Sequence, residues 1–227
     1  MKWLDSLHQK VKDANQQDFA SPISGEMLQL IIGALAALLP VSMIISAGFF
    51  SDCNTVQPSI SAYYHTGARD LFVGILCAVG VAMFAYKGYS KYDNFFATIA
   101  AVAAICVALF PTSVCDPMGV CIIDVIDTEW KNVIHLIAAV TLFMVLAIFC
   151  IFLFTITDKD ASAGRLMRNK IYYGCGIVIL LSIIIIAISM NVEGFPQHIL
   201  GFPVVFLFET VALVAFSLSW LTKSEKF

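Results

Sequence analysis

Charged residues are scarce in this chain of 227 residues, where they make up 13% of the sequence while hydrophobic residues make up 60%. A water-soluble domain of this length cannot bury so much apolar surface, so lipid must serve as the solvent for much of it. The sequence also lacks a basic stripe and an aromatic stacking platform. We therefore expect a membrane protein that has no nucleic-acid partner.

Common catalytic motifs are missing as well. The chain has no Gly-x-Ser-x-Gly, no phosphate-binding loop and no dinucleotide fingerprint. Ser61, His65 and Asp70 are residue types of a catalytic triad, but three members within ten residues is not a usual triad layout. The absence of a filter-like sequence argues against a channel. Whether the protein is an enzyme stays open at this point.

Six long apolar runs occupy most of the chain. They cover residues 28–50, 71–86, 95–110, 133–154, 171–190 and 202–221. Each is close to the roughly 17–25 residues that a helix needs to cross a bilayer. Because a spanning segment must satisfy its own backbone hydrogen bonds, the runs predict helices. We expect an all-α fold with one domain over residues 1–227, a bundle of six transmembrane helices.

Basic residues predict the orientation of this bundle. Of the 13 lysines and arginines, all but Arg69 and Lys131 lie before, between or after the runs on one side. The positive-inside rule places that side, with both termini, in the cytoplasm of a cell membrane protein. Residues 1–22 carry Trp3, Leu4 and Leu7 at helical spacing, which predicts an amphipathic cytoplasmic segment on the inner leaflet.

The seven cysteines divide by predicted depth. Cys77, Cys106, Cys150 and Cys175 fall in the apolar runs, and Cys53, Cys115 and Cys121 fall in outer loops. An oxidising exterior permits disulfides. The short CDPMGVC loop favours a Cys115–Cys121 bridge that leaves Cys53 over, although a bridge from Cys53 to either one, or three free thiols, stays open.

Two spacings gather polar groups on the outer side. If residues 58–70 are helical, Ser61, His65 and Arg69 share one face. Glu209 lies within the last apolar run, 11 residues after His198, which is about three helical turns, so both would point the same way. A carboxylate in a bilayer is costly unless it is paired, and Arg69 or a histidine is its expected partner.

These observations predict an outward-facing polar pocket that handles a lipid or small ligand without a cofactor. Its expected members are Ser61, His65, Arg69, Asp70, His135 and Glu209, with Glu193 and His198 at the rim. Arg69 is the only outer arginine and would hold a phosphate or carboxylate. In the alternative, His65, His135 and His198 bind zinc in a membrane hydrolase acting on a lipid amide or ester.

Two stretches resemble known families. QPSISAYYHTGARDLFVG, from Gln57, resembles the segment after the first span in the DRAM/Sfk/Frag superfamily, and VVFLFETVALVAF is similar to an acidic stretch in that family's last span. The resemblance implies six spans with both ends inside and a lipid-related role, since one branch includes a factor for GPI-anchor lipid remodelling. A fainter likeness to ceramidase and PAQR-type hydrolases rests on the Ser-x-x-x-His from Ser61 to His65, and implies a metal.

Overall fold

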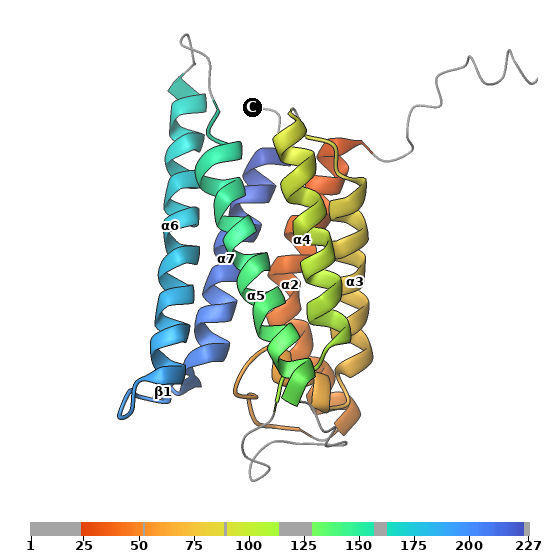
Figure 1. Cartoon of the computed structure of the whole chain (residues 1–227), viewed down its shortest axis with the longest axis vertical. Coiled ribbons are helices and arrows are strands. Elements are labelled where there is room, and N and C mark those ends of the chain that lie inside the picture. Colours follow the sequence, from red (N-terminus) through yellow and green to blue (C-terminus); the bar gives the residue numbers. More distant parts are fainter. Residues whose placement is uncertain (1–23, 52, 89, 114–128, 157–162, 225–227) are drawn as a thin grey trace, which may run out of the picture.

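A computed structural model of the chain is shown in Figure 1. It describes residues 24–51, 53–88, 90–113, 129–156 and 163–224. The amphipathic segment predicted over residues 1–22 lies outside these ranges. The described residues are mainly helical, and their only strands are the two-residue β1 (His198–Ile199) and β2 (Phe202–Pro203). The all-α prediction is therefore confirmed.

Six long helices correspond one by one to the six apolar runs. They are α2 (Gly25–Ser51), α3 (Arg69–Ala85), α4 (Lys91–Leu109), α5 (Glu129–Ile148), α6 (Ala163–Asn191) and α7 (Val204–Ser224). A π-helical turn, η2 (Phe149–Leu153), continues α5, and a short 3-10 helix, η1 (Ser61–His65), precedes α3. In the described part of the chain, five helices are long and apolar enough to cross a membrane, and α3, with 17 residues, is the shortest of the six.

The six helices pack side by side in the order in which they follow one another. Each contacts the next along the chain, and α7 packs back against α2. The start of α2 and the end of α7 lie at one end of the bundle, which we call the terminal end (Figure 1). Residues 53–68, 110–113 and 192–203 lie at the other end, which we call the loop end.

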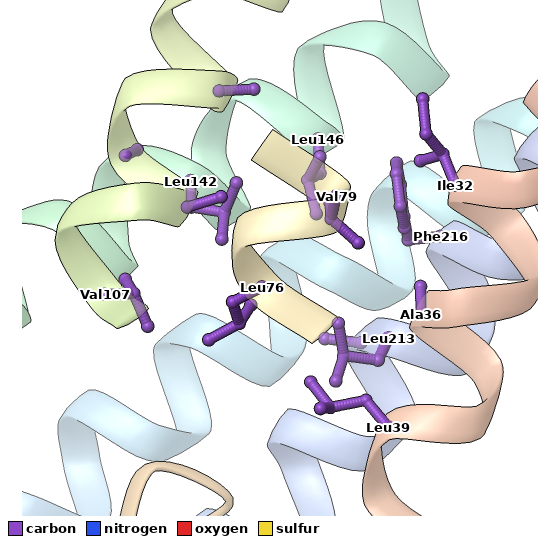
Figure 2. Close-up of a cluster of buried hydrophobic side chains, with 14 of the residues drawn as sticks. Ile32, Ala36, Leu39, Leu76, Val79, Val107, Leu142, Leu146, Leu213 and Phe216 are labelled. Carbon is purple, nitrogen blue, oxygen red and sulfur yellow. The ribbon is translucent and has the colours of Figure 1, made fainter. Parts of the chain in front are cut away.

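Apolar side chains from five helices fill the middle of the bundle. Figure 2 shows this cluster of Ile32, Ala36, Leu39, Leu76, Val79, Val107, Leu142, Leu146, Leu213 and Phe216. Close approach of α3 to α4 needs small residues, because a Cβ added at Gly80 would lie 2.8 Å from Cγ1 of Ile105 and 3.2 Å from the Ala101 carbonyl oxygen. Ala97, Ala101 and Ala104 of α4 are buried for the same reason.

Aromatic side chains close the bundle at the terminal end. Trp220 is fully buried, and its ring lies 5.1 Å from Tyr86, 5.5 Å from Phe149 and 5.4 Å from Phe154. Phe149 comes from the π-helical turn, which therefore brings the end of α5 against α7. Such ring pairs add to the stabilisation that burial alone gives.

The disulfide state of Cys53 differs from the preferred prediction, in which this residue has no disulfide partner. It is disulfide-bonded, whereas Cys77, Cys106, Cys150 and Cys175 carry free thiols. The predicted arrangement in which Cys53 has no partner is therefore wrong. Cys53 instead forms a disulfide that connects its loop to another segment. The Cys115–Cys121 pair lies outside the described residues.

The disulfide yields a first prediction. Peptide mapping of non-reduced protein should find the Cys53 peptide linked to a peptide from segment 114–128, and Cys53→Ser should remove that link. The substitution should lower the free energy of unfolding by roughly 2–4 kcal/mol, since the bridge closes a long loop. Cys106→Ser, at a free thiol, is the matched control. Alkylation of Cys53 in protein isolated without reductant would contradict the prediction.

Candidate functional site

The segment that follows Cys53 docks onto the first turns of α7. The amide N–H of Phe206 donates to the Pro58 carbonyl oxygen at 3.1 Å, and the amide N–H of Ile60 donates to Oε2 of Glu209 at 2.6 Å. The first amides of a helix have no partner within the helix, and Pro58 supplies one for α7. Since Phe206 and Glu209 are three residues apart, the loop follows one face of that helix.

Glu209 therefore has a backbone partner in place of the predicted cation. Its carboxylate accepts a charge-assisted hydrogen bond from Ile60. Its second oxygen, Oε1, has no partner among the described residues, and the side chain is partly exposed. In the described part of the chain no ion pair joins Glu209 to Arg69 or to a histidine.

Arg69 has its own partner at the start of α3. Its Nη2 donates to the Tyr64 hydroxyl at 2.9 Å, and the guanidinium carbon lies 4.5 Å from the centroid of the same ring. This combines a hydrogen bond with a cation–π contact and keeps the arginine on Tyr64.

The predicted common helix face for Ser61, His65 and Arg69 is wrong. Ser61–His65 is a 3-10 helix with three residues per turn, so positions four apart do not align. Thr66 is then extended, with φ −112° and ψ 178°, which ends the helix. Gly67 allows the chain to pass α2 closely, since a Cβ there would lie 2.9 Å from the Cβ of Phe50.

Ser61 instead meets His135 of α5. The serine Oγ lies 2.9 Å from Nε2 of His135, and Nδ1 of the same ring lies 2.7 Å from the Phe110 carbonyl oxygen. A carbonyl only accepts, so Nδ1 carries a proton, and in the neutral imidazole Nε2 accepts the proton of the Ser61 hydroxyl. Both side chains are buried, at 8% and 2% exposed.

The segment that carries the Phe110 carbonyl is fixed from two sides. His65 Nε2 lies 2.7 Å from the Thr112 carbonyl oxygen. Oδ1 of Asn132 accepts from the Ser113 amide at 2.9 Å and from the Thr112 hydroxyl at 3.1 Å. Sequence reasoning missed Asn132, although it lies one helical turn before His135 at the start of an apolar run.

Two further polar residues stiffen the loop. The Gln57 amide N–H donates to the Tyr63 hydroxyl at 3.3 Å, and Gln57 Nε2 lies 3.0 Å from the Cys53 sulfur. Burial raises the pKa of Tyr63, so the phenol stays neutral. The Tyr63 ring packs on Phe206 of α7, with 6.2 Å between centroids. Sequence analysis singled out neither Gln57 nor Tyr63.

The remaining predicted residues lie away from this cluster. Asp70 is exposed in the first turn of α3, and Glu193 and His198 are exposed in the connection between α6 and α7. His198 pairs with Pro203 across the β1–β2 hairpin, and α7 begins only at Val204. The predicted alignment of His198 with Glu209 on one helix is therefore wrong, because the chain turns between them.

The three candidate zinc ligands do not converge. Among the described residues, no group of three histidine, cysteine, aspartate or glutamate side chains could hold a metal ion. Both ring nitrogens of His135 have other partners, and His198 is exposed in the hairpin. The zinc-dependent hydrolase stays a prediction from sequence, without geometric support in the described ranges.

The structure thus brings together Ser61, His65, His135 and Glu209, which we call the loop-end cluster. Comparison of the chain with protein-family models, curated proteins and solved structures found no match. The resemblance to the DRAM/Sfk/Frag superfamily stays a prediction, and any function must be argued from the cluster itself.

Proposed function

We propose that the chain is a six-span integral protein of the cell membrane that binds a lipid or small amphiphile at the loop-end cluster. Five of its helices have the length and composition of membrane spans. The sixth, α3, has 17 apolar-rich residues, which is the lower end of the range that crosses a bilayer.

The orientation that we propose places the loop end outside and both termini in the cytoplasm. Among the described residues, Lys87 follows α3, Arg165 lies in the first turn of α6 and Lys223 lies in the last turn of α7, all at the terminal end. The disulfide of Cys53 at the loop end supports the same orientation, because disulfides persist in oxidising compartments.

The binding proposal depends on one observation, which is the environment of the Glu209 carboxylate. The residue belongs to an apolar helix, is partly exposed, and has one carboxylate oxygen without a described partner. Residues 207–211 of α7 are all partly exposed, so neither face of the helix is fully covered there. A carboxylate is costly at such a position unless something pairs with it. A headgroup that donates a hydrogen bond, such as an amine or hydroxyl, would supply the partner.

Topology gives a second prediction. A reporter fused after Phe227 should be cytoplasmic, and a tag inserted at Gly119 should be accessible from outside intact cells. The positive-inside rule and the even number of spans give this result. An externally accessible C-terminus would contradict it and would place the cluster on the cytoplasmic side.

The third prediction concerns Glu209. Phosphatidylethanolamine, which carries an ammonium group, should raise the unfolding temperature of the purified protein in detergent. Glu209→Gln should raise the lipid concentration needed for the same stabilisation about tenfold or more. The reason is that a hydrogen bond to a charged group contributes roughly 1.5–3 kcal/mol. Glu193→Gln, at an exposed position on the same end, is the matched control. Equal lipid dependence of the wild type and Glu209→Gln would reject the proposal.

A further inference from the structure

The pair formed by Ser61 and His135 has the geometry of an activated hydroxyl. An acyl-transfer nucleophile needs its base within about 2.6–3.2 Å, and the base needs a third group that fixes its tautomer. Here Oγ and Nε2 are 2.9 Å apart, and Nδ1 donates to the Phe110 carbonyl oxygen at 2.7 Å. All three groups come from separate segments of the chain.

Other serines in the protein show what a merely structural hydroxyl does. Ser42, Ser51, Ser182 and Ser189 each donate to a backbone carbonyl three or four residues earlier. Such local bonds are the usual solution for serine in a helix. Ser61 differs, because its hydroxyl meets an imidazole 74 residues away.

Further hydrogen bonds fix the positions of both Ser61 and His135. The residue before Ser61 donates its amide to Glu209, which fixes the start of the 3-10 helix. The carbonyl that orients His135 belongs to the segment pinned by His65 and Asn132. Reaction geometry kept in place before a substrate arrives reduces the cost of reaching the transition state.

The depth of the Ser61–His135 pair in the membrane indicates which class of substrate could reach it. His135 lies six residues after the start of α5, which is about 9 Å along the helix. In the proposed orientation this is near the boundary between headgroups and acyl chains in the outer leaflet. The ester bonds of an amphiphile reach that depth, and the partly exposed Glu209 binds the amide of Ile60, the residue before Ser61.

We propose that Ser61 is the nucleophile, and His135 the general base, of an esterase that acts on ester-linked amphiphiles. The proposal rests on the binding function proposed above. Ser61 Oγ bonds to the ester carbonyl carbon while its proton passes to His135 Nε2. The carbon–alkoxy bond then breaks, and the leaving alcohol takes that proton. Water attacks the acyl-serine, its proton passes through Nε2 to Oγ, and a carboxylic acid leaves.

The test uses the full chain purified in detergent, with p-nitrophenyl octanoate as substrate and a fluorophosphonate as covalent probe. We expect ester hydrolysis, and we expect the probe on the peptide that contains Ser61. Ser61→Ala and His135→Gln should each lower the hydrolysis rate at least 100-fold. Ser59→Ala, in the same loop, should not change it, because the Ser59 hydroxyl bonds only to the nearby Ala62 amide among the described residues.

The outcomes separate this inference from the binding proposal. Lipid binding is read from the wild type and Glu209→Gln, whereas hydrolysis is read from the wild type and Ser61→Ala. Wild-type protein that binds this lipid but neither hydrolyses the ester nor carries the probe on Ser61 overturns the inference alone. Labelling of the wild type needs no variant, so an unfolded Ser61→Ala does not weaken the test.

Discussion

The hydrogen bond from the Ile60 amide to Glu209 is the contact on which the loop end depends. It places a carboxylate of α7 at the start of η1, and with the bond from Phe206 to Pro58 it fastens the loop to the helix. Buried backbone amides need partners, and this amide is satisfied by a side chain 149 residues away. Ser61, the next residue in the chain, begins η1 directly beside that bond.

The two histidines of the cluster then connect this loop to α5 and to the end of α4. His135 joins η1 to the end of α4, and His65 joins η1 to the same stretch two residues later. Three segments that are distant in sequence, namely η1, α5 and residues 110–112, therefore meet through histidine hydrogen bonds that involve no ion pair. Such a network suits an apolar surrounding, where burying an ion pair carries a large desolvation cost.

Packing differs between the two ends of the bundle. At the terminal end, Trp220 and its aromatic neighbours are closed off, and the π-helical turn brings α5 against α7. At the loop end, residues 207–211 of α7 stay partly exposed beside the cluster. The terminal end is thus closed by aromatic rings, and the loop end is built from polar groups of the loops and helix starts.

The sequence by itself determined the six helices, because apolar runs of spanning length leave the backbone no other way to satisfy its hydrogen bonds. It also singled out His135 and Glu209, since polar groups are rare in such runs, and Ser61 through its spacing to His65. Only the tertiary structure decided their partners. The break at Thr66 separated Arg69 from Ser61, and the hairpin separated His198 from Glu209. The Phe110 carbonyl is a backbone group, which no side-chain pattern could reveal. Hydrogen bonds between segments 19 or more residues apart depend on how loops fold back, and local periodicity carries no information about that.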